Sequence, residues 1–261
     1  MIKIEHIKKS LDGKEVLRGI DLEVKRGEVL AIIGGSGMGK SVLLKHILGF
    51  LRPDSGDVLV EGVSIPNCTL ARLYEVRKTF GVVFQSPALL QSLTVEENVS
   101  LPLREHTDYT PEKIAGIVRD RLHLVRLFDV EAKFPSQLSG GMQKRVSLAR
   151  ALVMDPAIIL FDEPATGLDP ILTATIGQLI VDLHRRIGFT AIAVTHNMDF
   201  AYQIADRIAM LHEGRIIAEG TPEEIKNTTQ PQVQNFISGI PREEAHRASV
   251  QVGESASRER Q

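Results

Sequence analysis

A glycine-rich segment, GGSGMGKS at residues 34–41, is the strongest candidate for chemistry in this sequence. It matches the pattern G-x-x-x-x-G-K-[ST], follows a short apolar run at 29–33 and opens a helical pattern at 41–48. Backbone N–H groups of such a loop curl around a phosphate, and the following helix adds its dipole. We expect Lys40 to reach the outer phosphates and Ser41 to give a hydroxyl to Mg²⁺. The predicted phosphate site comprises Gly34, Gly35, Ser36, Gly37, Met38, Gly39, Lys40 and Ser41.

Two other interpretations of this segment are weaker. A dinucleotide-binding loop is also glycine-rich, but it lacks the Lys-Ser pair found here. A chance glycine-rich turn needs neither the apolar strand before it nor the helix after it. The segment therefore favours binding of a nucleoside triphosphate.

Two carboxylates follow a second apolar run, AIILFDE at 157–163. In open α/β sheets, ligands bind at the carboxyl ends of the strands, which is where this pattern places Asp162 and Glu163. Asp162 is expected to hold Mg²⁺, mostly through water, and Glu163 to orient and deprotonate an attacking water. Taken alone, a strand followed by two acids is more often a solvated loop. The phosphate loop upstream favours the catalytic interpretation.

A third segment, LSGGMQ at 138–143, closely resembles the signature LSGGQ of ATP-binding cassette (ABC) proteins, with Met142 in place of the usual glutamine. Ser139 is expected to cap the helix that follows, and Gly140 and Gly141 to let a phosphate approach that helix end. By itself, the segment is equally consistent with a capped helix whose start is flexible.

Three further positions resemble the ABC pattern in order and spacing. Gln85 matches the glutamine of the Q-loop, Asp169 in TGLD matches the D-loop, and His196 matches the switch histidine. Asp169 before Pro170 is also a good helix cap, and an isolated His196 would more often be a strand-end histidine. The resemblance, which covers about residues 2–225, implies an ATPase. It implies Glu163 and His196 as catalytic residues, and Ser41, Gln85 and Asp162 as the Mg²⁺ site.

One expected feature of that family is absent. An aromatic residue upstream of the phosphate loop usually stacks on adenine, but no Phe, Tyr or Trp occurs before Phe50. The aligned position is Leu11, which covers the base without the aromatic pairing of ~0.5–1.5 kcal/mol. We therefore expect loose recognition of adenine.

A finer resemblance narrows the substrate. The run at 73–107 is similar to the ATPase subunits of MCE-type phospholipid transporters, chiefly in LPLREHT (101–107) and FQSPALL (84–90). VQNFISGI at 233–240 is similar to their C-terminal helix. This resemblance implies a lipid substrate, an integral membrane permease and an MCE-domain lipid-binding protein as partners. An ABC ATPase of a polar-solute importer, and a soluble ABC ATPase without a membrane partner, are the alternatives.

These residues need an α/β scaffold to bring them together. Alternating patterns at 2–8 and 16–24 predict antiparallel strands, and short apolar runs predict buried strands at 29–33, 157–161 and 190–194. Further strands are predicted at 56–60 and 81–84, a hairpin at 207–219, and helices within 87–150, from 170, after 197 and from 221. The expected fold is a P-loop NTPase (RecA-like) with a mainly parallel sheet, an N-terminal antiparallel β subdomain and a helical insertion. Residues 1–240 are predicted to form the ABC ATPase domain, with a helical subdomain at about 87–150, and the polar tail 241–261 to be disordered.

Composition limits the remaining function classes. The 261 residues are 43% hydrophobic and 25% charged, and the net charge of −2 gives no indication of nucleic-acid binding. A single cysteine, Cys68, excludes an internal disulfide framework. No run approaches the ~20 apolar residues of a membrane span. We therefore expect a peripheral protein on the cytoplasmic face of the inner membrane. One set of motifs per chain predicts a homodimer that holds two ATP molecules between its copies.

Overall fold

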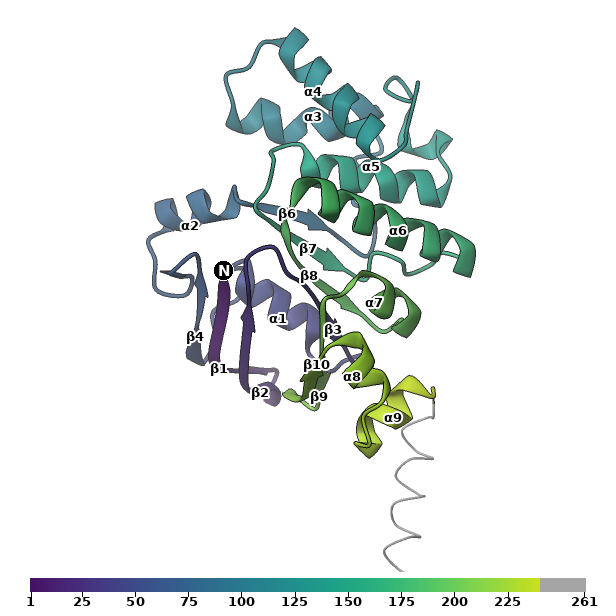
Figure 1. The fold of residues 1–261 in the computed structure, drawn as a ribbon. Helices are drawn as coiled ribbons and strands as arrows, with labels where there is room; N and C mark the ends of the chain where they lie inside the picture. The colour runs from purple at the N-terminus through teal and green to yellow at the C-terminus, as the bar shows by residue number, and fades with distance from the viewer. Residues whose placement is uncertain (240–261) are drawn as a thin grey trace, which may run out of the picture.

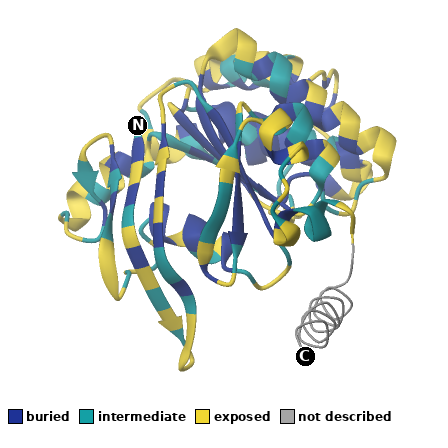
Figure 2. Ribbon diagram, turned by 60° about the horizontal axis from the view of Figure 1, so that its bottom comes forward, coloured by how far each residue is buried: buried dark blue, intermediate teal, exposed yellow. Residues whose placement is uncertain are grey.

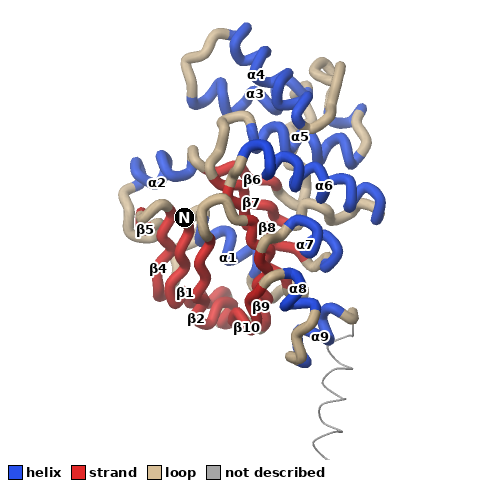
Figure 3. Tube along the Cα trace, in the orientation of Figure 1, coloured by secondary structure: helices blue, strands red, loops and turns tan. Residues whose placement is uncertain are grey.

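The computed structural model describes residues 1–239, which form two sheets with helices around them (Figures 1 and 3). The N-terminal sheet has the strand order β2-β1-β4-β5, and the larger sheet the order β10-β9-β3-β8-β7-β6. The first contains β1 (Ile2–Leu11), β2 (Lys14–Val24), β4 (Ser55–Val60) and β5 (Val63–Ser64). The second contains β3 (Val29–Ile33), β6 (Phe80–Val83), β7 (Ile158–Asp162), β8 (Thr190–Thr195), β9 (Arg207–His212) and β10 (Arg215–Gly220). Antiparallel pairing in the first sheet, and parallel pairing of β3, β6, β7, β8 and β9 in the second, confirm the predicted fold.

The core lies on both faces of the larger sheet, which explains its continuous apolar strands (Figure 2). Ile159 and Ala191 belong to the cluster that includes α5 (Gly140–Leu152) and α6 (Pro170–Ile187). Leu160 and Ile192 belong to the cluster with α1 (Lys40–Ile47) and the N-terminal sheet. Successive residues of each strand therefore pack into different layers, and the carboxyl ends of the strands are held at one edge.

Three helices follow β6 in the segment predicted to be helical. They are α3 (Val95–His106), α4 (Pro111–Leu124) and α5, and their buried residues share one cluster. Thr110 caps α4 through a hydrogen bond from the Lys113 N–H, as its sequence indicates. The helices are confirmed, whereas the boundaries of the helical subdomain and of the ATPase domain remain predictions. The predicted tail, 241–261, lies outside the described residues.

The remaining elements include one strand and one helix that the sequence analysis did not predict. They are β5 and α2 (Leu70–Arg77). Val76 and Leu73 of α2 pack against the core, whereas Leu70 and Tyr74 are exposed, so only half of its large apolar residues mark the buried face. Helices α7 (Met198–Ile204), α8 (Pro222–Lys226) and α9 (Pro231–Ile237) complete the described chain. The predicted capping box of Thr221 and Glu224 opens α8, and the predicted hairpin joins β9 to β10.

Candidate functional site

The glycine-rich loop joins β3 to α1, and a side chain at either of two of its glycines would collide with a neighbouring strand. Gly34 has φ +152, and a Cβ there would lie 2.3 Å from the Leu211 carbonyl oxygen. Gly39 has φ +103, and a Cβ there would lie 2.9 Å from a methyl carbon of Leu17. α1 begins directly after Gly39 without a side-chain cap, so its first N–H groups and the helix dipole can serve an anion.

Lys40 is buried within this loop. Its Nζ donates to the carbonyl oxygens of Gly34 (2.7 Å) and Gly35 (3.0 Å) and lies 3.7 Å from Oε1 of Glu163. Burial lowers the pKa of the Lys40 ammonium, and the negative charge of Glu163 opposes that shift. The ammonium thus lies among oxygens that a phosphate oxygen can replace, as phosphate binding requires.

Ser41 and Asp162 meet at the start of α1 and the end of β7. The Ser41 hydroxyl donates to Oδ1 of Asp162 at 3.1 Å, across 121 positions of sequence. Burial raises the pKa of Asp162, and the hydrogen bond from Ser41 opposes the shift. Residues 1–239 hold no cluster of three or more His, Cys, Asp or Glu side chains suited to a metal. Two oxygen donors fit Mg²⁺, which takes one or two protein ligands beside substrate phosphates.

Glu163 and His196 form the second half of the site. Nδ1 of His196 lies 2.9 Å from Oε2 of Glu163, a distance that fits an Nδ1–H donor. The Thr166 hydroxyl donates to the same oxygen at 3.3 Å. Glu163 adopts φ +50, an uncommon conformation for a residue other than glycine, and only 8% of its surface is exposed. The carboxylate is therefore oriented by two neighbours next to Lys40.

The signature segment lies at the start of α5, apart from these groups. Ser139 caps α5 by accepting a hydrogen bond from the Met142 N–H at 3.3 Å, which confirms the predicted cap. Ser139 and Gly140 are exposed, whereas Gly141 is buried beside Leu172. The hydrogen bonds of Ser139 and Lys40 go to different parts of the chain, so the structure does not join the two phosphate-binding segments within one copy.

Three predicted site residues lie at the edges of this arrangement. Gln85 follows β6 with an exposed side chain, and Leu11 ends β1 with its side chain half-buried. Asp169 caps α6 by accepting from the Leu172 N–H at 2.9 Å, which confirms its structural role. The functional roles of all three remain predictions.

Two contacts of the site were missed by sequence reasoning. Thr166 was noted only within TGLD, and its bond to Glu163 needs the tight turn after β7, where the Thr166 N–H donates to the Glu163 carbonyl oxygen. Lys144 of α5 donates to the Gln85 carbonyl oxygen across 59 positions. The available signal was the helical spacing of Lys144, three residues after Gly141 and four before Leu148, which places it on the buried face of α5.

Comparison with known proteins decides the family. Residues 17–166 match the model of the ABC transporter family, a stretch that contains the phosphate loop, Gln85, the signature and both acids. The chain belongs to the ABC transporter family. It is therefore an ATP-binding and ATP-hydrolysing subunit, and the family, fold and activity predicted from sequence are confirmed.

Individual ABC proteins resemble this chain over most of its length. MlaF of Haemophilus influenzae, an intermembrane phospholipid transport system ATP-binding protein, is 39% identical over 239 residues, 92% of this chain and 90% of MlaF. The probable ribonucleotide transport ATP-binding protein mkl of Mycobacterium leprae is 42% identical over 238 residues, 91% of this chain and 69% of mkl. The ATP-binding cassette MJ0796, solved as a dimer bound to ADP and Pi after hydrolysis, matches with a TM-score of 0.77 and 32% identity. The match covers 85% of this chain and 99% of the MJ0796 chain. Within residues 1–239, no helix has the length and apolar character that crossing a membrane requires.

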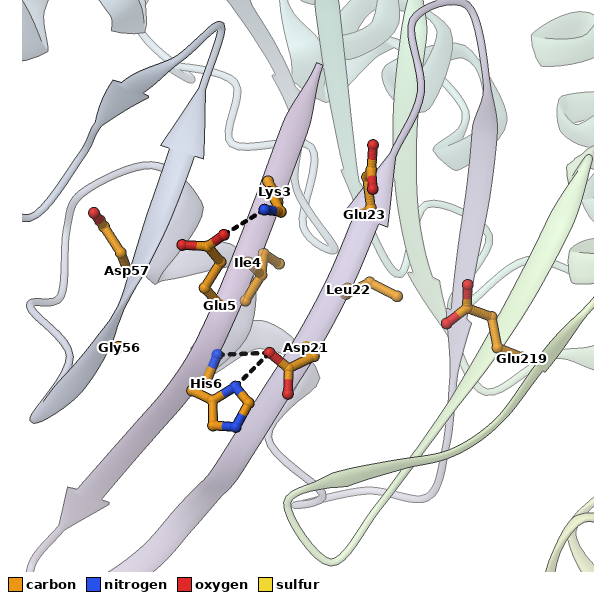
Figure 4. A pocket seen from close by; sticks show the side chains of 10 residues that line it. All are labelled: Lys3, Ile4, Glu5, His6, Asp21, Leu22, Glu23, Gly56, Asp57 and Glu219. Carbon is orange, nitrogen blue, oxygen red and sulfur yellow. Dashed lines mark hydrogen bonds and ion pairs between the residues drawn. The ribbon is translucent and has the colours of Figure 1, made fainter.

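A hollow elsewhere on this ABC subunit is unsuited to a nucleotide. It lies on the N-terminal sheet beside β10 (Figure 4). Its lining includes the carboxylates Glu5, Asp21, Glu23, Asp57 and Glu219, with Lys3 and His6. Lys3 pairs with Glu5, and His6 contacts Asp21 at 2.7 Å, so the remaining charge is negative. Such a surface repels a triphosphate.

Proposed function

We propose that this subunit hydrolyses ATP to drive phospholipid transport through an integral membrane permease. The observation that carries the proposal is the likeness to MlaF, which extends over 90% of that protein and includes the run at 73–107, with its segments 84–90 and 101–107. An MCE-domain lipid-binding protein is the further partner proposed. The proposed localisation is peripheral, on the cytoplasmic face of the inner membrane.

A polar-solute transporter is the second candidate. It is favoured by the likeness to mkl, which carries a ribonucleotide transport name. The match spans less of mkl than of MlaF, so it constrains the whole protein less. A soluble ABC ATPase without a membrane partner is disfavoured, since both MlaF and mkl carry transport names.

The proposed chemistry divides the site into binding and reacting groups. Residues 34–41 cradle the phosphates, with the Lys40 ammonium on the outer ones, and Leu11 covers the base. Ser41, Asp162 and Gln85 would hold Mg²⁺, which neutralises charge on the phosphates when bound. Glu163 orients and deprotonates the attacking water, while His196 fixes the Glu163 carboxylate from 2.9 Å.

The proposed working unit is a pair of copies. Ser139 and Gly140 are exposed at the N-terminus of α5, and Lys40 of the same copy bonds to its own loop rather than to them. In a head-to-tail pair, these residues and Asp169 would approach the nucleotide on the partner's Lys40. MJ0796 is solved as a dimer bound to ADP and Pi, which supports the pairing of two copies.

Purification of the tagged subunit together with its membrane partners tests the function. The complex is expected to contain a permease and bound phospholipid, and its ATPase rate in vesicles to respond to phospholipid. The same complex is assayed with ribonucleotides as the control. A complex that contains no bound phospholipid, and whose ATPase rate is stimulated by ribonucleotides instead, would reject the lipid proposal.

A further inference from the structure

Two cations of α5 hold the backbone of the loop that carries Gln85. The Lys144 ammonium donates to the carbonyl oxygen of Gln85. Arg150 donates from Nη1 to the Ala88 carbonyl oxygen at 2.7 Å and from Nη2 to the Pro87 carbonyl oxygen at 2.9 Å. Three of the four carbonyl groups in residues 85–88 thus accept hydrogen bonds from one helix.

The loop is held by α5 after it has left the sheet. β6 ends at Val83, which pairs with Phe161, and Ala88 adopts φ +50. Upstream, a Cβ on Gly81 would lie 2.4 Å from the Ala151 carbonyl oxygen, so β6 and the end of α5 are in direct backbone contact. The strand, the loop and α5 therefore form one packed unit.

The Lys144 ammonium is buried, and its burial carries a desolvation penalty. Only 6% of its surface is exposed, and burial lowers the pKa of its ammonium, against the opposing charge of Glu163. A buried ammonium is stable only with an acceptor, and the acceptor here is the Gln85 carbonyl oxygen. An apolar side chain would fill the same space without that desolvation penalty, so packing alone does not explain the lysine.

α5 also carries the signature at its start. Its cap, Ser139, precedes Lys144 by five residues, which is about 7.5 Å along a helix. We propose that Lys144 and Arg150 are positioning residues that fix Gln85 relative to the signature of the same chain. A nucleotide bound at Ser139–Gly141 in one site of the pair then orients Gln85 in the other site. α5 is thereby the physical link between the two ATP sites.

This inference rests on the proposed pairing and on the proposed role of Gln85, and a double-mutant cycle tests it. Lys144→Met is expected to lower kcat by about tenfold to a hundredfold, the effect of losing a hydrogen bond to a charged donor. ATP binding measured without Mg²⁺ is expected to stay unchanged. In a Gln85→Ala background, Lys144→Met is expected to cause no further loss, because it acts through the glutamine. Lys144→Arg, which keeps a cationic donor, is expected to retain most of the wild-type kcat.

Arg145 supplies the matched control on the same helix. Its Nη1 donates to the Arg126 carbonyl oxygen at 3.0 Å, away from the Q-loop. The loss caused by Arg145→Met is therefore expected to add fully to that of Gln85→Ala. Thermal unfolding identifies variants that fail to fold, and Arg150→Lys, which keeps the charge but loses one of two donors, repeats the cycle independently.

The possible outcomes distinguish the positioning role of Lys144 and Arg150 from the proposed role of Gln85. If Gln85→Ala is impaired but the losses from Lys144→Met and Arg150→Lys add to it as Arg145→Met does, the positioning role is wrong and the role of Gln85 stands. If Gln85→Ala hydrolyses ATP at the wild-type rate, the proposed role of Gln85 fails, and the link fails with it.

Discussion

Nδ1 of His196 lies 2.9 Å from Oε2 of Glu163 in the same chain, although 33 positions of sequence separate the two residues. The contact exists because β7 and β8 are parallel neighbours, so the residues after each strand meet at one edge of the sheet. The proposed base is therefore oriented within a single copy. In the proposed pair, the partner copy supplies the signature, whereas the orientation of Glu163 needs only one copy.

Glu163→Gln is expected to bind ATP normally and to lose hydrolysis by ~10²–10⁴-fold, the usual effect of removing a general base. The amide keeps the size of the carboxylate but cannot take a proton from water. Nucleotide binding and phosphate release are measured separately. Phosphate release at the wild-type rate would contradict the assignment.

His196→Ala is expected to lower hydrolysis less than Glu163→Gln does, because the histidine acts by holding the carboxylate. In the double variant, the histidine change is expected to add nothing, since residues that act through one another are not additive. Measurement of kcat for the four proteins checks this. An additive loss would assign His196 a task of its own.

Lys40→Ala is expected to remove nucleotide binding itself, in contrast to Glu163→Gln. Its ammonium lies within 3.0 Å of the loop carbonyl oxygens and compensates charge already present on the ligand. Equilibrium binding of labelled ATP gives the measurement. Lys113 is exposed in α4, and its ammonium lies over the Tyr109 ring. Lys113→Ala is therefore the control, and its ATP affinity is expected to be unchanged.

The sequence predicts the parts of this protein that local rules govern. The strand at 29–33 matches β3 residue for residue, and the caps at Thr110, Ser139 and Asp169 all form. Each depends on a short-range pattern or on a side chain that accepts a hydrogen bond from the N–H three residues ahead. The order of the motifs then placed Asp162 and Glu163 at the correct edge of the sheet.

Contacts between distant segments were beyond those rules. The bond from Lys144 to Gln85 depends on how α5 packs against β6, which no local pattern encodes. The helix at 70–77 was missed because the exposed Leu70 and Tyr74 are large apolar residues like Leu73 and Val76, which face the core, so the pattern of apolar residues does not single out one face. The failures therefore fall where tertiary packing decides the outcome.

Gly81→Ala is expected to destabilise the fold by about 1–3 kcal/mol, because the new methyl group would overlap the Ala151 carbonyl oxygen. Gly116→Ala is the matched control, since a Cβ there meets nothing within 4 Å and lies in α4. That change is expected to stabilise the protein by about 0.5–1 kcal/mol. Urea unfolding gives both values, and a neutral Gly81→Ala would refute the tight contact of β6 with α5.

Weak discrimination between ATP and GTP is expected from Leu11. Contacts to phosphate and Mg²⁺ are the same for both nucleotides, and an aliphatic side chain does not stack on the base. The two hydrolysis rates are expected to differ by less than about tenfold, which corresponds to roughly 1.4 kcal/mol. Steady-state kinetics with each nucleotide provide the test. A much larger preference for ATP would mean that another residue recognises adenine.

The two halves of each ATP site are expected to come from different copies. Ser139 caps α5 and points the positive end of that helix toward solvent, while Lys40 of the same chain lies in its own loop. Ser36, in that loop, is also exposed.

With the free Cys68 replaced by Ser, Ser36→Cys and Ser139→Cys are introduced together into the Glu163→Gln protein, which retains ATP. An intermolecular disulfide is expected to form with ATP and not without nucleotide. A second protein with Lys113→Cys in place of Ser139→Cys is the control for random collision. Crosslinks confined to one chain, or none at any ATP concentration, would mean that the signature does not face a partner's nucleotide.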